Sequence, residues 1–413
     1  MSLNILFLSL LDFNNLDESN IYTDLLNEFI KNQHHVSIIS PSEKRKQSKE
    51  THLIKIGDNC EILKLRIGNI TKTSFLEKGI STILLENKFI SGIKKFFRDK
   101  QFDLVIYSTP PVTFANVIKF IKRRDNCKSY LLLKDIFPQN AVDLNILKDR
   151  GLLYNFFRYK EKKLYKLSDY IGTMSKANSD YIKKHNSFRK NQIVEINPNT
   201  IKTDTERCLD DSDIKKIRSS FGISDTSILL LYGGNLGKPQ GIDFLLNIVL
   251  NIENQEDLFF AIIGSGTEFT KIENFLKMNK TRRTKLFDYM PKEQYEVFEK
   301  AADIGVILLD KRFTVPNVPS RLLGYMKHKK PILAATDRNT DLKDMIREGN
   351  FGLWSEHGDV LNFMENINKL TDKRYRMKLG QNGNKYFKEN FDVEVSYSII
   401  LNHFDRSEDV VQK

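Results

Sequence analysis

The chain has 413 residues, of which 40% are hydrophobic and 29% charged, and its formal net charge is +12. This length is enough for two or three domains with buried cores, and no apolar run approaches the roughly 18 to 20 uncharged residues that a membrane-spanning helix needs. The three cysteines, Cys60, Cys127 and Cys208, have no metal-ligand spacing, which is typical of a reducing cytosol. The first residues lack a basic region and a cleavage site, so they predict a buried strand and not a signal peptide.

The positive charge is concentrated in one half of the chain. Residues 1–200 contain 33 Lys and Arg against 21 Asp and Glu, whereas residues 201–413 contain 32 of each kind. A basic half is typical of a protein that faces a polyanion, such as a membrane surface, a diphosphate lipid or nucleic acid. The alternative is that a composition rich in lysine, isoleucine and asparagine reflects an AT-rich genome.

The first elements predict a parallel sheet. A strand over residues 4–9, an amphipathic helix over 21–32 and a strand over 35–40 form a strand–helix–strand unit. The loop after the first strand, where nucleotide-binding folds place their ligand, contains no glycine between Asp12 and Asn20. It is therefore not a dinucleotide-binding loop.

Residues 75–98 predict a long amphipathic helix. One side is aliphatic and aromatic, and Lys88, Lys94, Lys95 and Arg98 lie towards its end. Such a helix can lie in a membrane interface, or it can pack on its own sheet. Both interpretations stay open at this point.

A carboxylate follows one of the next strands. Residues 103–107 and 131–133 predict buried strands, and Asp135 comes just after the second. This is where α/β proteins place ligand sites, so Asp135 can bind a sugar hydroxyl or accept a proton. It can equally cap the next turn. A lysine-rich helix over 154–167, expected to be a solvated face, and strands over 170–174 and 194–196 complete this half.

The pattern restarts after a polar segment at residues 200–226, where we place the domain boundary. A very apolar strand over 228–232 leads into a glycine-rich loop at 233–241. Glycines let the backbone approach a ligand closely, and Lys238 can neutralise a phosphate. Pro239 follows Lys238 where a P-loop requires Ser or Thr, which excludes a P-loop.

The later strands of this half also end in polar or glycine-rich loops. Strands are expected at 259–263, 285–287 and 304–308, followed by Gly264–Gly266, Asp288–Pro291 and Asp310. The carboxyl ends of parallel strands meet at one edge of a sheet. We therefore expect a second doubly wound domain with one ligand crevice.

Residues 313–336 predict a loop, a helix that begins at Ser320, and a short strand after Pro331. The first turn of a helix leaves backbone N–H groups unpaired, so residues 319–321 can hold a phosphate, with Arg321 as the counter-charge. The alternative is an ordinary capped surface helix.

Together these features resemble the retaining GT-B glycosyltransferases of family 4, which build bacterial capsules, O-antigens and related glycans. The resemblance covers essentially the whole chain. Four segments carry it: residues 21–26 with His35 and Val36, residues 134–139, residues 233–241, and residues 319–326 with 330–334.

The resemblance implies an α/β protein of GT-B architecture, with two Rossmann-like doubly wound domains facing a central cleft. Residues 1–200 would bind the acceptor and residues 201–381 the nucleotide-sugar donor. A C-terminal helix over 382–404 would be able to pack back on the first domain. Hinge closure between the halves is expected on donor binding.

The resemblance also implies roles for single residues. Asp135, Lys238 and Arg321 are the expected catalytic groups. The expected donor-side residues are Gly234, Asn235, Lys238, Gly264, Ser265, Gly266, Tyr289, Met290, Ser320, Arg321 and Leu322. The expected acceptor-side residues are Ser19, Asn20, Lys134 and Asp135.

The implied chemistry is transfer of a hexosyl or N-acetylhexosaminyl group from a nucleotide-sugar, expected to be a UDP-sugar, with retention of configuration. No metal or cofactor is expected, because cations and a helix N-terminus would stabilise the departing diphosphate. The expected acceptor is a glycan or an undecaprenyl-diphosphate-linked sugar in bacterial surface polysaccharide synthesis. The expected location is the cytoplasm. A peripheral position on the inner face of the cytoplasmic membrane is the alternative.

One departure from the family pattern opens alternatives. The family usually carries two glutamates eight positions apart, the second of which contacts ribose, and here Pro316 and Gly324 occupy those positions. A non-catalytic GT-B subunit that binds a partner or glycan is therefore a competing reading. A UDP-sugar 2-epimerase is another, although only Asp135 is a candidate for its acidic cluster. Nucleic-acid binding has least support, because the basic residues are dispersed and no recognition motif occurs.

Overall fold

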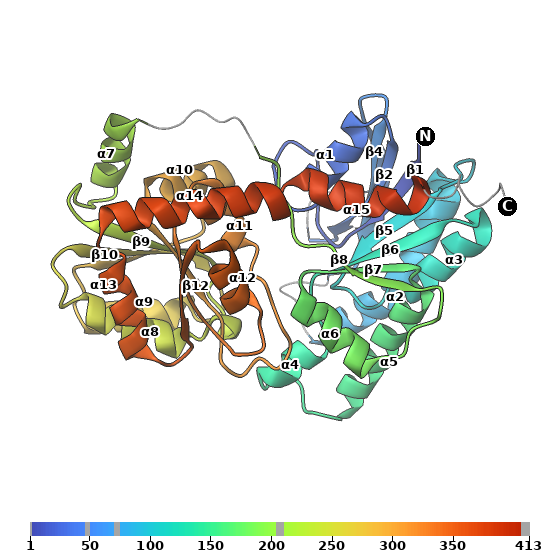
Figure 1. Cartoon of the computed structure of the whole chain (residues 1–413). Helices are drawn as coiled ribbons and strands as arrows, with labels where there is room; N and C mark the ends of the chain where they lie inside the picture. The colour runs from blue at the N-terminus through green and yellow to red at the C-terminus, as the bar shows by residue number, and fades with distance from the viewer. Residues whose placement is uncertain (1, 46–49, 70–74, 204–209, 406–413) are drawn as a thin grey trace. The chain divides into compact units, whose positions relative to one another are not determined.

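The computed structural model describes residues 2–45, 50–69, 75–203 and 210–405, which form two compact units (Figure 1). Unit 1 contains the chain up to Lys202 and again from Val393, and unit 2 contains Thr203–Asp392. No helix among these residues is long and apolar enough to cross a membrane.

Unit 1 is built on an eight-stranded sheet in the order β3-β4-β2-β1-β5-β6-β7-β8. All neighbouring strands are parallel except β3 and β4. The strands are β1 (Asn4–Leu8), β2 (His35–Glu43), β3 (His52–Ile56), β4 (Cys60–Ile67), β5 (Leu104–Ser108), β6 (Lys128–Leu133), β7 (Tyr170–Thr173) and β8 (Ile193–Ile196). The strand order reverses between β1 and β5, and ligand crevices of doubly wound sheets lie at such reversals.

Helices cover both faces of this sheet because its central strands are apolar on both sides. The helices are α1 (Thr23–Lys31), α2 (Phe75–Phe96), α3 (Ala115–Asp125), α4 (Gln139–Asp143), α5 (Leu152–Leu167), α6 (Lys176–His185) and α15 (Val393–Asp405). Helices α1 and α15 contact each other and cover one face, where Ile5 and Phe7 of β1 join Val393 and Ile400 of α15 in one core. Helix α3 contacts both α2 and α5.

Most described apolar side chains of residues 75–98 are not available to a membrane interface, although Leu84 is exposed. Helix α2 forms as predicted, but Leu85, Phe89, Ile93 and Phe97 are all buried in the core of unit 1. Their burial supports the alternative, a helix packed on its own sheet. The side chains of residues 75–83 lie outside the described part of the structure.

Unit 2 has a six-stranded parallel sheet in the order β11-β10-β9-β12-β13-β14. The strands are β9 (Ile228–Asn235), β10 (Leu258–Ser265), β11 (Thr284–Phe287), β12 (Ile304–Leu308), β13 (Ile332–Thr336) and β14 (Gly352–Glu356). The helices are α7 (Asp211–Ser220), the short 3-10 helix η1 (Lys238–Gln240), α8 (Ile242–Ile252), α9 (Phe269–Met278), α10 (Lys292–Ala301), α11 (Arg321–Lys327), α12 (Leu342–Gly349), α13 (Val360–Lys369) and α14 (Lys373–Asn390). The strand order reverses between β9 and β12, which predicts a ligand crevice at their carboxyl ends.

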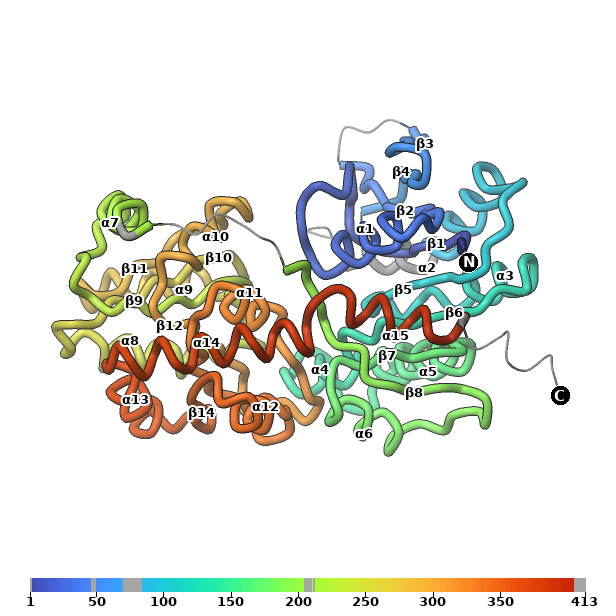
Figure 2. Tube along the Cα trace, turned by 45° about the horizontal axis from the view of Figure 1, so that its top comes forward, coloured from blue at the N-terminus to red at the C-terminus, as the bar shows by residue number. Residues whose placement is uncertain are grey.

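The single C-terminal helix predicted over residues 382–404 is wrong in its bounds. Helix α14 ends at Asn390, and α15 begins at Val393 (Figure 2). The break coincides with the limit of unit 2, where the backbone N–H and side-chain hydroxyl of Thr203 both donate to the Asp392 carboxylate. Residues 382–390 therefore belong to unit 2, and only α15 belongs to unit 1.

Helix α14 is fixed to unit 2 through a close backbone approach at Gly380. A Cβ atom at Gly380 would lie 1.9 Å from the carbonyl oxygen of Lys329, which follows α11. A Cβ atom at Gly383, one turn further along the same helix, would lie 3.3 Å from the nearest atom, the Cβ of Phe351. Only the first position needs glycine for packing.

Gly380→Ala is expected to destabilise unit 2 by about 1–3 kcal/mol, because the new methyl group forces α14 away from the backbone of Lys329. Thermal unfolding would show a fall in Tm of about 3–10 °C. Gly383→Ala is the matched control, since the same change in the same helix adds helix propensity without a backbone clash. Equal Tm values for the two variants would contradict this account of α14 docking.

Candidate functional site

The β9–β12 reversal of unit 2 carries a glycine-rich loop that is packed backbone against backbone. Gly234 has φ +122° and Gly264 has φ +153°, and a Cβ at Gly264 would lie 1.8 Å from the Gly234 carbonyl oxygen. A Cβ at Gly266 would lie 2.3 Å from the carbonyl oxygen of Leu236. Gly264 and Gly266 are thus needed to bring the end of β10 against the end of β9. Their predicted contact with a nucleoside stays a prediction.

Arg321, the first residue of α11, lies beside this loop. Its Cζ is 4.7 Å from the ring centroid of Tyr232, and its Nη2 donates to Gln240 Oε1 at 2.9 Å. A Cβ at Gly234 would lie 3.6 Å from the same Nη2. The sequence-predicted residues Gly234 and Arg321 are therefore neighbours, and Gln240 is a member of the site that the sequence did not single out.

The Arg321 guanidinium is buried without a full set of partners. Its Nη1 is buried and has no hydrogen-bond acceptor among the described residues. Tyr232 and Gln240, its partners, are both uncharged at neutral pH. Burying a cation without an anion is costly, and an unsatisfied donor at a crevice is what an anionic ligand would complete.

The remaining donor-side predictions fall into two groups. Asn235, Lys238 and Ser320 are exposed, and the exposed fraction of Tyr289 is 68%. The side chain of Leu322 is fully buried in the core, so only its backbone can meet a ligand. Ser265 is exposed and Met290 is partly buried.

The predicted helix start at residue 320 is confirmed, but the helix itself is short. Helix α11 spans Arg321–Lys327, and Ser320 makes no side-chain hydrogen bond to its first turn. Few peptide dipoles are aligned in a helix of 7 residues. Anion binding here would therefore depend on the Arg321 side chain more than on the helix terminus.

The Tyr325 side chain holds the backbone of β9 just before the glycine-rich loop with two hydrogen bonds. Its hydroxyl donates to the Leu231 carbonyl at 2.9 Å and accepts from the Gly233 N–H at 3.1 Å. The Tyr295 hydroxyl in turn donates to Tyr325 Oη at 3.4 Å. A Cβ at Gly233 would lie 1.9 Å from the Tyr295 hydroxyl oxygen, so this glycine makes room for the tyrosine pair.

The Glu299 side chain lies against Gly324, the position at which the glycosyltransferases that this chain resembles have their second glutamate. A Cβ at Gly324 would lie only 2.4 Å from Glu299 Oε1, so a larger residue at 324 would require the Glu299 side chain to move. Glu299 comes from α10 and is buried, with His328 Nε2 3.7 Å from its Oε2. Burial raises the pKa of Glu299 to about 8. The carboxyl group is therefore largely protonated at neutral pH.

His357, just after β14, is a further buried group that the sequence did not indicate. Both ring nitrogens are buried without hydrogen-bond partners among the described residues, and a Cβ at Gly241 would lie 1.9 Å from Nε2. Burial lowers the pKa of His357, although the charge of Asp310 opposes this. Asp310 itself binds Arg312 through two hydrogen bonds to the guanidinium, and its N–H donates to the Pro239 carbonyl at 2.9 Å.

In unit 1, Lys134 and Asp135 follow β6 near the β1–β5 reversal. The Thr109 hydroxyl accepts from the Lys134 N–H at 3.2 Å and donates to the Asp135 carbonyl at 3.1 Å, which fixes the backbone. Burial raises the pKa of Asp135 to about 6 and lowers the pKa of Lys134 to about 7. Burial also raises the pKa of Tyr22, which interacts with Ser108 and Asp135.

Asp135 does not cap the next helix, which was the alternative reading. Helix α4 begins at Gln139, and its N-cap residue is Pro138, without a side-chain hydrogen bond. A carboxyl group with a pKa near 6 beside a strand end can act as an acid or a base close to neutral pH.

The other two acceptor-side predictions have structural partners. Ser19 Oγ donates to Asp24 Oδ2 at 2.8 Å, and Asn20 Oδ1 accepts from the N–H groups of Tyr22 and Thr23 at the start of α1. Both side chains therefore order the loop after β1. Their contact with an acceptor stays a prediction.

Within the described ranges, no group of three or more His, Cys, Asp or Glu side chains could hold a metal ion. Metal independence stays a prediction.

Solved structures of other proteins share the fold of this chain. Sucrose-phosphate synthase from Thermosynechococcus elongatus superimposes with a TM-score of 0.76 over 99% of this chain and 100% of that one, at 15% identity. A structure of HepE from Anabaena in complex with UDP-glucose superimposes with a TM-score of 0.69 over 98% and 100%, at 12% identity.

The chain has the GT-B fold.

In sequence, residues 213–386 match the family model described as Glycosyl transferases group 1. The probable glycosyltransferase WbjE of Pseudomonas aeruginosa is 22% identical over 68% of this chain and 68% of its own length. The putative colanic acid biosynthesis glycosyl transferase WcaI of Escherichia coli is 27% identical over 28% of each chain. The match to the family model includes the glycine-rich loop, Glu299, Arg321 and His357.

Glu299→Gln is expected to remove a pH-dependent loss of stability. The pKa of Glu299 is raised on folding, so its contribution to stability is fully present below pH 4.5 and is lost as the pH rises through about 8. At pH 9 the variant should be more stable than wild type, by on the order of 2–4 kcal/mol.

Thermal unfolding between pH 5 and pH 9 measures this difference. The Tm advantage of the variant should be small at pH 5 and largest at pH 9. Glu293→Gln, an exposed position on the same helix, is the control and should follow wild type. A constant difference between Glu299→Gln and wild type across this range would contradict a buried, protonated Glu299.

Proposed function

We propose that this protein is a glycosyltransferase that binds a nucleotide-sugar in unit 2 and transfers the sugar to an acceptor hydroxyl. The observation that carries the proposal is the buried Arg321 guanidinium, which has an unsatisfied Nη1 next to the glycine-rich loop at a topological switch point. Such a group is suited to the diphosphate of a donor and to the charge that develops on it as the sugar departs. Lys238 is the second expected diphosphate contact.

A UDP-sugar is the proposed donor. The support is indirect and comes from the structural neighbour HepE, whose structures contain UDP-glucose, UDP with glucose, or UDP. We propose a hexosyl or N-acetylhexosaminyl donor, retention of configuration and no requirement for a metal. Because retention means that donor and product have the same anomeric configuration, NMR of the product tests it directly.

The proposed acceptor is a glycan or an undecaprenyl-diphosphate-linked sugar used for a capsule or another bacterial surface polysaccharide. Two observations support it: the sequence relative named for colanic acid biosynthesis, and the net charge of +12 carried by residues 1–200. A diphosphate-linked lipid would require the protein to work at the inner face of the cytoplasmic membrane. Asp135 and Lys134 are the proposed acceptor-side groups.

A non-catalytic GT-B subunit is the second candidate. It is favoured by Pro316 and Gly324, which replace two carboxylates of the family pattern. The packing of Glu299 against Gly324 accounts for one of these replacements and keeps a carboxyl group at that place. This observation favours an active enzyme that has rearranged its site.

Lys238→Ala is expected to weaken binding of one nucleotide by about tenfold, because one charge-assisted contact to a phosphate is lost. Thermal-shift titrations with UDP, GDP, ADP and CMP measure this and identify the base. Lys215→Ala, an exposed lysine on α7, is the matched control and should bind as wild type does. If folded wild-type protein binds none of the four, the donor site is refuted.

Measurements of turnover then distinguish a glycosyltransferase from an epimerase and from a non-catalytic subunit. Release of UDP from UDP-glucose, UDP-galactose or UDP-N-acetylglucosamine with an acceptor extract indicates transfer. Conversion of the sugar without UDP release would indicate an epimerase. Nucleotide binding without either reaction would indicate a non-catalytic subunit.

Asp135→Asn is expected to lower kcat/KM by at least about a hundredfold if its carboxylate accepts the acceptor proton. In wild type the rate should rise with pH through about 6, because the carboxylate becomes ionised there. In the variant the rate should no longer rise with pH through about 6, and nucleotide should still bind. An unchanged pH profile in Asp135→Asn would remove Asp135 from the mechanism.

A further inference from the structure

Exposed large apolar side chains gather on one part of unit 1. Within the described chain, residues 146–159 hold the densest run of them. They are Ile146 (60% exposed), Leu152 (91%), Leu153 (46%), Phe156 (42%) and Tyr159 (63%). We call these five residues the α5 ridge. Isolated exposed apolar residues are ordinary, but a contiguous exposed group marks an interaction site.

Four of the five ridge residues lie on α5, three of them on one face, and that face continues into a basic region. The spacing of Leu152, Phe156 and Tyr159 places them on one helical face, and Lys163 and Lys166 follow on the same face. The N-terminal half of this exposed face is therefore apolar and aromatic, and its C-terminal half is cationic.

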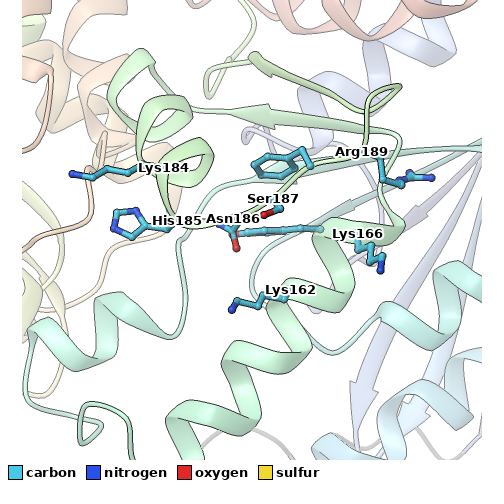
Figure 3. A pocket seen from close by; sticks show the side chains of 9 residues that line it. Lys162, Lys166, Lys184, His185, Asn186, Ser187 and Arg189 are labelled. Atoms are coloured by element: carbon cyan, nitrogen blue, oxygen red, sulfur yellow. The ribbon is translucent and has the colours of Figure 1, made fainter.

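The basic end of α5 opens onto a cavity of about 580 Å³. Lys162 and Lys166 project from α5, Lys184 and His185 come from the end of α6, and Arg189 comes from the segment before β8 (Figure 3). The floor includes Tyr165, which is stacked on Phe188. The cavity is thus lined by cations on an aromatic base.

Part of this positive charge is neutralised by the protein, because Lys160 pairs with Glu86 and Arg189 pairs with Asp169. Residues 146–166 contain seven Lys and Arg against two acidic residues. Glu161 is buried and paired with Arg158, and Asp149 lies by Arg150. Lys162, Lys166 and Lys184 make no ion pair within the part of the chain that the structure describes.

We propose that the α5 ridge inserts into the headgroup boundary of an anionic lipid membrane, with the lysines at the basic end of α5 facing the lipid phosphates. An anionic bilayer presents an acyl layer and a phosphate layer, and an interfacial helix with exposed apolar and lysine side chains is complementary to both. Tyr159 and Phe156 are residue types favoured in that boundary. The surface differs from α2, where Leu85, Phe89 and Ile93 are buried and only Leu84 among the described apolar side chains is exposed.

This inference rests on the lipid-linked acceptor of the proposed function, for which it provides a docking surface. Its test does not depend on catalysis. The full-length protein is sedimented with vesicles of phosphatidylcholine alone or of phosphatidylcholine and phosphatidylglycerol, and the bound fraction is measured against lipid concentration. Wild type should bind the anionic vesicles and bind the neutral ones much more weakly.

Two variants test the two ends of the surface. Leu152→Glu with Phe156→Glu should weaken binding to anionic vesicles by more than about tenfold. Lys162→Gln with Lys166→Gln and Lys184→Gln should weaken it by on the order of a hundredfold, since each lysine near an anionic surface contributes about fivefold. The second variant should also lose most of the dependence on salt.

Matched controls come from unit 2. Leu361→Glu with Met377→Glu changes two exposed apolar side chains, and Lys215→Gln with Lys378→Gln and Lys388→Gln removes the same charge. Both controls should bind vesicles as wild type does. Equal losses in controls and test variants would overturn the proposal, as would a wild type that does not bind anionic vesicles.

Two further outcomes would also overturn it. If inorganic phosphate at constant ionic strength displaces the protein from vesicles, the basic end is a site for a soluble anion. If wild type dimerises with concentration and Leu152→Glu abolishes the dimer, a second copy covers the ridge. Nucleotide thermal shifts that persist in the variants separate a failure of this proposal from a failure of the proposed function.

Discussion

A buried cation without a protein anion is the constraint on which the donor site depends. Arg321 is held by the face of Tyr232 and by the amide of Gln240, both uncharged at neutral pH, and its Nη1 lacks an acceptor among the described residues. Gly234, whose φ of +122° favours glycine, lies beside the guanidinium. The glycines at the ends of β9 and β10 are then needed so that the two strand ends fit together. The crevice is therefore arranged in advance around a positive charge.

A second set of contacts supports this arrangement from inside unit 2. Tyr325 binds the backbone of β9 at Leu231 and Gly233, and Tyr295 binds Tyr325. Glu299 lies against Gly324, where its protonated carboxyl group can be buried at lower cost than a carboxylate. The departure of this chain from the family pattern at residue 324 is thus a change in packing as well as in sequence. A carboxyl group from a different helix, that of Glu299, lies beside Gly324.

The sequence was sufficient for the central strands and for the two-domain division, because parallel strands buried on both faces appear as continuous apolar runs. It did not indicate β3, β4 or β14, which lie at the edges of the two sheets or next to them. It also placed Gly234 and Arg321 correctly at one strand reversal. It could not reveal Gln240, Glu299 or His357, since their importance arises from contacts between distant segments and no local motif marks them. Periodicity also could not distinguish a helix that buries its apolar face, as α2 does, from one that exposes it, as α5 does.

The hydrogen bonds between Thr203 and Asp392 have a consequence for the order in which the protein is made. They close unit 2 at both its ends, so unit 2 is an insertion within the sequence of unit 1. Helix α15 supplies Val393 and Ile400 to the core of unit 1, and its Tyr397 and His403 bind His34 and Glu195. During synthesis the ribosome must therefore release almost the whole chain before unit 1 can complete its core. Unit 2 can fold first, and unit 1 must wait with one face of its sheet uncovered.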